Sequence, residues 1–196
     1  MSSALFETAI AAFDRANAED PNKEIYQGKE YPKELLYGMR MNAWLEKLRP
    51  AAPEFLRLAA RAQHLRRWEI PRAQYPMDRA GYLKWRTGLY DFHAEKAGSI
   101  LAEAGYDEAV IQKVQALLRK QNLKTNPDMQ LLEDVICLVF LENYFADFSK
   151  QHDEEKMVLI IQKTWKKMSD EGHQAALQIP MSLTAAALVQ KALKNA

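Results

Sequence analysis

Apolar residues recur at helical spacing along almost all of this 196-residue chain, and no segment alternates convincingly between apolar and polar side chains. With only seven glycines as well, the chain gives almost no indication of β-strands. The length allows one domain with a substantial core, at an ordinary 48% hydrophobic content. The sequence therefore predicts an all-α fold, a single compact multi-helix domain over residues 1–196.

The pattern predicts seven or eight helices separated by proline, glycine and polar segments. The first five expected helices span residues 3–18, 32–50, 53–67, 80–104 and 107–121. A sixth begins at Pro127 with Asn126 as its N-cap, another lies before Gly172, and the last spans 182–194. A loop with Gly28 is expected after the first helix, and an irregular excursion over 68–79. The run "VICLVFL" is apolar all round, so we expect its helix to be the central one.

Charge, cysteine content and apolar run length exclude several classes of protein. Lys and Arg number 27 against 26 Asp and Glu, so the net charge of +1 gives no general attraction to nucleic acid or membrane. The single cysteine, Cys137, excludes an internal disulfide framework. The N-terminal segment carries Glu7 and Asp14 and does not resemble an export signal. Apolar runs are shorter than the roughly 20 residues of a membrane span. We expect a cytoplasmic protein with no membrane partner.

Two of the four histidines are predicted to face inward. Residues 85, 89, 93, 97 and 101 share one helix face, which places His93 among apolar neighbours. His64 is expected one turn before the end of its helix, beside Gln63, in a half-buried position. The alternatives are a core histidine satisfied by a carbonyl and a histidine that interacts with a helix dipole. His152 and His173 neighbour charged runs and are expected to be solvated.

Glu133 and Asp134 form a third candidate element. They are expected two turns inside their helix and directly before its most apolar stretch. A carboxylate in such a place needs a cation, a hydrogen-bond donor or a metal, and arginine is the commonest partner. His64, His93 and Asp134 together offer the ligand types that Zn, Fe, Mn or Co prefer, so the sequence predicts a divalent metal site.

A basic and aromatic segment lies between residues 61 and 86. Guanidinium groups bind phosphate and exposed aromatics stack on bases, so this segment is a candidate site for a phosphorylated small molecule or nucleotide, or for RNA. The candidate ligand-binding residues are Arg66, Arg67, Arg72, Arg86 and Trp68. The alternative is that the arginines pair with acids such as Glu133, Asp134 and Glu142, while the aromatics pack against the helices.

The motifs "ELLYGMRMNAWLEKL", "EFLRLAARAQHLRRW", "DFHAEKAGSILAEAG" and "LLEDVICLVFLE" resemble the HD superfamily of metal-dependent phosphohydrolases across about residues 33–142. Tyr37 stands where that family has its first histidine, and Gln63-His64 stands where it has His-Asp. His93 and Asp134 match the later positions directly. The motifs "FDRANAEDPN", "AQHLRRWEIPR" and "YPMDRAGYLKWR" also look like an uncharacterised family, domain of unknown function 4202, which implies no established activity.

The HD resemblance implies an HD-like fold and a metal-dependent hydrolase or oxygenase acting on a phosphorylated small molecule or nucleotide. His64, His93 and Asp134 would hold the metal, Gln63 or Glu133 would orient water or a ligand, and the arginines would neutralise phosphate charge. Alternatively, the substitutions leave a pocket without metal in a non-catalytic nucleotide- or RNA-binding protein. A third alternative is an interaction module whose helix at 182–194 joins a partner or a second copy.

Overall fold

The computed structural model describes residues 3–122 and 125–194, and these residues are mainly helical. The all-α prediction is confirmed, with one small two-stranded sheet in the described part of the chain. The chain divides into two compact units, Met1–Leu123 and Lys124–Ala196, each with its own packing. The single domain over 1–196, with an HD-like core at 33–142, stays a prediction.

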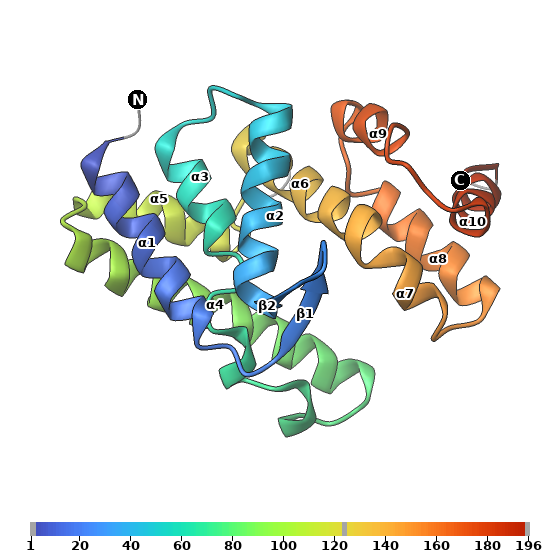
Figure 1. Ribbon diagram of the computed structural model, residues 1–196, viewed down its shortest axis with the longest axis horizontal. Coiled ribbons are helices and arrows are strands. Elements are labelled where there is room, and N and C mark those ends of the chain that lie inside the picture. The colour runs from blue at the N-terminus through green and yellow to red at the C-terminus, as the bar shows by residue number, and fades with distance from the viewer. Residues whose placement is uncertain (1–2, 123–124, 195–196) are drawn as a thin grey trace. The chain divides into compact units, whose positions relative to one another are not determined.

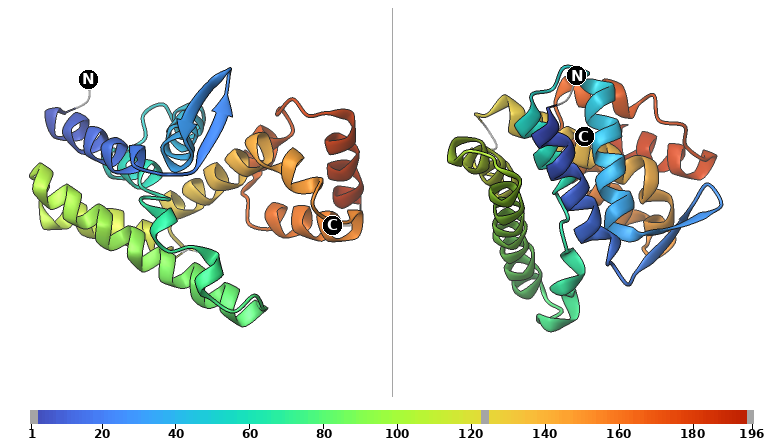
Figure 2. Two further views of the ribbon diagram at one scale, coloured as in Figure 1. Left: turned by 60° about the horizontal axis from the view of Figure 1, so that its bottom comes forward. Right: turned by 60° about the vertical axis from the view of Figure 1, so that its left-hand side comes forward.

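The N-terminal unit is built on two groups of helices. Its elements are α1 (Ala4–Ala18), β1 (Lys23–Tyr26), β2 (Lys29–Pro32), α2 (Lys33–Leu48), α3 (Glu54–Arg61), the 3-10 turns η1 (Arg67–Glu69) and η2 (Arg72–Gln74), α4 (Arg79–Ala104) and α5 (Glu108–Leu118). Helices α1, α2 and α3 pack on one another (Figure 1). Helices α4 and α5 lie side by side (Figure 2), and α5 also packs on α3.

Side-chain caps explain where several of these helices begin and end. Asp78 accepts a hydrogen bond from the backbone of Gly81 at the start of α4, and Asp107 accepts one from Val110 at the start of α5. Gly105 ends α4 in the left-handed conformation at φ +95°, as its position in the sequence predicts. The 26-residue α4 thus has both of its ends fixed by local chemistry.

The core of the N-terminal unit draws on each of its α-helices. The fully buried side chains include Phe13, Leu36, Met41, Leu45, Leu56, Leu58 and Leu101. Each such side chain contributes about 1.5–3 kcal/mol on burial, so these side chains hold the helices that carry the candidate site. Leu65 is also fully buried although it lies outside any helix, which anchors the turn that carries His64.

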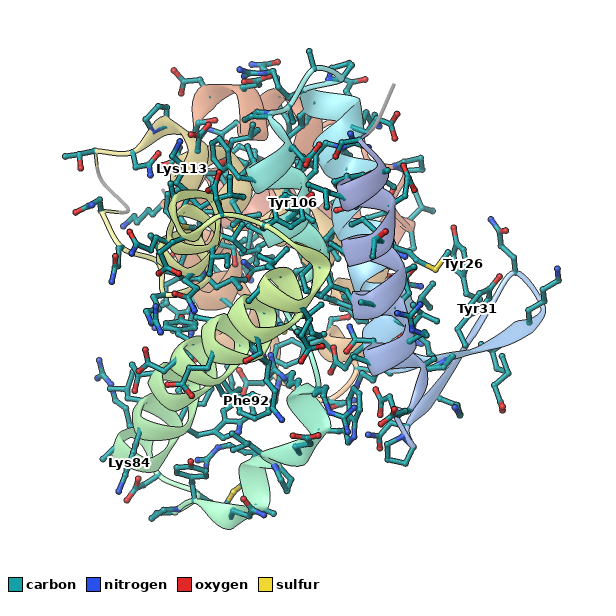
Figure 3. The ribbon with its side chains drawn as sticks, turned by 90° about the vertical axis from the view of Figure 1, so that its left-hand side faces the viewer. Tyr26, Tyr31, Lys84, Phe92, Tyr106 and Lys113 are labelled. Atoms are coloured by element: carbon teal, nitrogen blue, oxygen red, sulfur yellow. The ribbon has the colours of Figure 1, made fainter. Side chains whose placement is uncertain are left out.

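The segment from 23 to 32 forms a β-hairpin, so the prediction of a loop there is wrong. Strands β1 and β2 pair antiparallel, with Tyr26 opposite Lys29. Gln27 and Gly28 both have positive φ, at 49° and 74°, as a tight hairpin turn requires. Figure 3 shows Tyr26 and Tyr31 on this hairpin, where their ring centroids lie 6.4 Å apart. Strands of only four residues leave too little alternation to be seen in the sequence.

Helix α3 ends at Arg61, so the predicted continuation to residue 67 is wrong. The chain instead turns through Ala62 to Arg66, and Arg66 adopts a left-handed backbone at φ 53°. The amide of Arg66 donates to Asn17 Oδ1 at 2.9 Å, and Asn17 is 2% exposed. A buried contact from α1 therefore fixes this turn. The irregular excursion predicted after residue 68 is confirmed by η1, η2 and their connections.

The C-terminal unit contains α6 (Pro127–Asn143), α7 (Phe145–Ser149), α8 (Glu154–Trp165), α9 (Asp170–Ala176) and α10 (Leu183–Lys194). Asn126 caps α6 and Pro127 is its first residue, as predicted. Helix α6 has buried residues on every side, whereas Gly172 lies inside α9 rather than after a helix. None of the helices in the described residues has both the length and the hydrophobicity required to cross a bilayer.

Candidate functional site

His64 lies in the turn between α3 and η1, where it contacts residues from two other helices. Its ring stacks on Tyr37 of α2, with centroids 3.8 Å apart and planes 8° from parallel. The ring of His93 on α4 lies 6.0 Å away, centroid to centroid. We call Glu34, Tyr37, His64, Arg67 and His93 the His64 cluster. Four separate elements supply it, so the turn at 62–66 is what brings its members together.

Both ring nitrogens of His64 have hydrogen-bond partners. Nδ1 lies 2.9 Å from Glu34 Oε2, and Nε2 lies 2.8 Å from a guanidinium nitrogen of Arg67. Arginine can only donate, so Nε2 is the acceptor and Nδ1–H donates to Glu34. The contacts therefore define one neutral tautomer of His64, held between a carboxylate and a guanidinium.

Electrostatics within the cluster keep the His64 imidazole neutral. Burial, followed by the positive charge of Arg67, lowers the pKa of His64 well below its usual value. Burial also raises the pKa of Glu34, although the nearby charge of Arg67 opposes that change. Side chains of both residues keep some contact with solvent, at 23% exposure for His64 and 10% for Glu34. The result is an unprotonated nitrogen, Nε2, placed beside a fixed positive charge.

His93 is deeply buried, at 3% exposure, so its predicted inward position is confirmed. Its Nδ1–H donates to the backbone carbonyl of Leu65 at 2.9 Å, which matches the alternative of a histidine satisfied by a carbonyl. Its Nε2 is buried and has no hydrogen-bond partner among the described residues. Burial, together with the nearby His64, lowers the pKa of His93 to about 3. Phe92, the residue before it on α4, is marked in Figure 3.

The candidate phosphate-binding arginines separate into one that joins the cluster and three that contact other groups. Arg67 contacts His64 and lies over the ring of Trp85, 4.8 Å from its centroid. Arg66 pairs with Glu19 and Glu69 and lies 5.4 Å from the ring centre of Trp68. Arg72 donates to the backbone carbonyls of Tyr75, Pro76 and Asp78, and Arg86 donates to the hydroxyl of Tyr90. Arg67 is thus the best placed of the four to meet a ligand at His64.

Gln63 is buried, at 7% exposure, directly before His64. Its side-chain nitrogen Nε2 has no hydrogen-bond partner among the described residues. A buried donor without a partner is costly, so this amide is available to a ligand or a water molecule. The prediction that Gln63 orients water or a ligand stays a prediction, supported by this unsatisfied donor.

Glu133 and Asp134 of α6 are buried, and both have partners within the C-terminal unit. Asp134 accepts from the backbone amide and the hydroxyl of Ser169, at 2.8 and 2.5 Å, and from Gln130 Nε2 at 3.1 Å. Its predicted need for a partner is thus met by neutral donors rather than by an arginine. Glu133 Oε1 lies 3.9 Å from Lys167 Nζ. Asp134 therefore fixes the beginning of α9, since Ser169 is the N-cap of that helix.

The prediction that His173 is solvated is wrong. Its Nε2–H donates to the carbonyl of Trp165 at 2.9 Å, and its ring stacks on the Trp165 indole at 4.1 Å between centroids. The nearby glycine and acidic residues suggest a frayed end, but they belong to α9, which packs on α6.

The predicted metal ligands do not form a ready ligand set as they lie. His93 Nε2 has the buried, unpartnered lone pair that a metal ligand needs. His64 and Asp134 would each have to exchange existing hydrogen bonds for a metal bond. Within residues 3–122 and 125–194, no three His, Cys, Asp or Glu side chains are grouped as a metal site. His93 and Asp134 belong to different units, so their joint site stays a prediction.

Glu34 is the member of the cluster that the sequence did not single out. It lies in the first turn of α2, where an acid is usually explained by the helix dipole. Its backbone amide donates to Asp20 Oδ2 at 3.0 Å, and its side chain is free to turn inward to His64. The spacing of three between Glu34 and Tyr37, which puts both on one helix face, is the pattern that could have revealed it.

A model of the family described as a domain of unknown function, DUF4202, matches residues 7–189. The chain belongs to this family. No curated protein and no solved structure gives a significant match. The DUF4202 match includes the whole His64 cluster and Glu133 and Asp134 of α6, and it assigns no activity to them. The family prediction is confirmed.

Proposed function

We propose that this DUF4202 protein is an enzyme that acts on a phosphorylated small molecule or nucleotide, with the His64 cluster as its reaction centre. The observation that carries the proposal is the series of hydrogen bonds from Glu34 through His64 to Arg67. It places a histidine of defined tautomer between a carboxylate that orients it and a guanidinium that can bind an anion. The resemblance to HD phosphohydrolases favours the same class of substrate.

In this proposal His64 is the general base. Glu34 holds Nδ1–H, so the lone pair of Nε2 points away from the carboxylate and toward Arg67. The lowered pKa keeps that lone pair available near neutral pH. Stacking on Tyr37 restricts rotation of the ring. A histidine oriented by a carboxylate is a frequent arrangement for moving a proton in catalysis.

Arg67 would bind the phosphate. Its guanidinium already lies 2.8 Å from Nε2, so an anion that takes up this group is held next to the base. When Arg67 donates to a phosphate instead, Nε2 becomes free to accept a proton from water. The water oxygen then forms a new bond to phosphorus, and the ester P–O bond breaks. The leaving oxygen takes the proton back from His64.

A divalent metal, Fe, Mn, Zn or Co, is a separate part of the proposal. It would supply Lewis-acid activation of water or phosphate, and His93 is the best-placed of its predicted ligands. Metal analysis of protein purified without chelators tests this. Stoichiometric metal that is lost in both His64→Ala and His93→Ala supports the site. Metal-free protein whose melting temperature does not change on adding Mn²⁺ or Zn²⁺ excludes it.

The activity is tested by phosphate release from a panel of nucleotides and simple phosphate esters, with and without added Mn²⁺. We expect wild-type protein to release phosphate and His64→Gln to be inactive while folded. Arg67→Met should mainly raise KM, because it removes phosphate binding. His152→Gln is the matched control, since His152 lies in the other unit and contacts Phe148 and Lys156. Activity that survives in His64→Gln would refute the role of the cluster.

A second candidate is a non-catalytic protein that binds a nucleotide or RNA. Two guanidinium–indole pairs favour it, Arg66 over Trp68 and Arg67 over Trp85, because such surfaces also stack on bases. Nucleotide binding without any turnover, lost in Arg67→Met, would favour this candidate over the enzyme. RNA binding that weakens steeply with salt would identify the RNA-binding form.

A further inference from the structure

The C-terminal unit contains a cavity of about 190 Å³ that the proposed reaction does not use. Its walls come from α6, α8, α9, α10 and the segment between the last two helices. The lining includes Leu141, Ile161, Trp165, Ile179, Ala186 and Val189. The cavity is partly open to solvent and its walls are mainly apolar, as is usual for pockets that bind small molecules.

Two features of the surrounding residues keep the cavity open. The Trp165 indole is held by its stack on His173, whose Nε2–H is in turn bonded to the Trp165 carbonyl, so the indole is restrained from collapsing inward. Helix α10 contributes the small side chains of Ala186 and Val189, which leave space where larger residues would fill it. The cavity is thus a consequence of particular side chains on two helices that pack on each other, α8 and α10.

The lining defines the chemistry of an occupant. No charged side chain lines the cavity. An ion would lose part of its hydration there without gaining a charged partner, so the lining favours an occupant that is uncharged and mainly apolar. Thr164 and Gln190 also line the cavity and can each take part in one hydrogen bond with an occupant. The Thr164 hydroxyl already donates to the carbonyl of Ile160 at 2.9 Å, so its oxygen remains an acceptor.

The volume of the cavity limits the size of an occupant. An apolar cavity of about 150 Å³ in a well-studied protein takes up benzene. A cavity of about 190 Å³ therefore holds one six-membered ring with a small substituent. We propose that the cavity between α8 and α10 is a binding site for an uncharged single-ring molecule that carries one hydrogen-bond donor. This inference does not depend on the proposed function of the His64 cluster.

The test uses the full chain with ¹³C-labelled methyl groups and three probes of one size: phenol, toluene and benzoate. We expect phenol to give saturable shifts at the methyls of Ile161, Ile179, Ala186 and Val189, with toluene weaker and benzoate inactive. Ala186→Phe fills the cavity and should abolish saturation. Ala187→Phe, on the exposed side of the same helix, is the matched control and should bind as the wild type does.

Several results would overturn the proposal. One is the absence of saturable shifts with phenol and toluene, and another is binding of benzoate as strong as that of phenol. Unchanged phenol binding in Ala186→Phe is a third. If Ala186→Phe does not fold, the phenol-induced shifts of the wild-type methyl groups test the site without it. Shifts confined to methyl groups of the lining would support the site. Shifts centred on methyl groups outside the lining would refute it.

Discussion

Replacing His93 with glutamine should remove a large part of the decrease in unfolding free energy that this protein undergoes as the pH falls. His93 is 3% exposed, and burial lowers its pKa from 6.5 to about 3. In the folded protein it therefore stays neutral at pH 5, whereas in the unfolded chain it takes up a proton below about pH 6.5. Because the unfolded state then binds more protons, stability falls as the pH falls.

The size of the effect follows from that shift. Each pH unit between 6.5 and about 3 costs about 1.4 kcal/mol of unfolding free energy for this one group. Between pH 7 and pH 5 the loss is about 2 kcal/mol. His64, whose pKa is also lowered, adds a loss of the same sign. Glu34 acts in the opposite direction, since its raised pKa lets the folded protein take up a proton first.

Urea denaturation at four pH values from 5 to 8 measures this directly. The quantity to compare across that pH range is the difference in unfolding free energy between wild type and His93→Gln. Both proteins contain His64 and Glu34, so the contributions of these two residues largely cancel in that difference. We expect His93→Gln to be less stable at pH 8, where its bond to the Leu65 carbonyl and its packing are impaired. The difference in unfolding free energy between the two proteins should be about 2 kcal/mol smaller at pH 5 than at pH 8.

A constant gap between wild type and His93→Gln from pH 8 to pH 5 would refute this reasoning. It would mean that His93 has the same proton affinity in the folded and unfolded chain. The buried, unpartnered Nε2 that supports its assignment as a ligand would then be accessible to water.

Two further predictions concern the packing of helices. Ser169→Ala removes both the N-cap of α9 and a hydrogen-bond donor to Asp134. Urea denaturation should therefore show that the unfolding free energy falls by about 2–4 kcal/mol. A decrease below about 0.5 kcal/mol would contradict the assigned role of Ser169. Gly81→Ala would place a methyl group 2.1 Å from the carbonyl oxygen of Pro76 and should lower the melting temperature. Gly88→Ala is its control, because the nearest atom to the new methyl is 3.9 Å away, and this variant should be slightly stabilised.

Local chemistry explains what could be predicted from the sequence. Asn126 with Pro127, and Gly105 after a periodic run, identify helix ends because each acts through its own backbone. The inward position of His93 follows from four-residue spacing in a long helix, which no distant contact alters. These features depend on neighbours within one or two turns.

Distant contacts explain what could not be predicted. The end of α3 at Arg61 depends on the left-handed turn at Arg66, whose amide is held by Asn17, 49 residues earlier. The partnership of Glu34 with His64 spans 30 residues and requires that turn. The role of Asp134 as an anchor for Ser169 likewise joins positions 35 apart. Helix periodicity carries no information about such pairs.

The stack of His64 on Tyr37 also has a spectroscopic consequence. Rings that are nearly parallel with centroids 3.8 Å apart place each ring's protons in the shielding region of the other. The carbon-bound protons of the His64 imidazole should therefore resonate upfield of the positions that a neutral histidine has in an unfolded chain. Any ligand that separates the two rings would shift these resonances downfield. The chemical shifts of the His64 protons therefore report whether a ligand is bound at the His64 cluster.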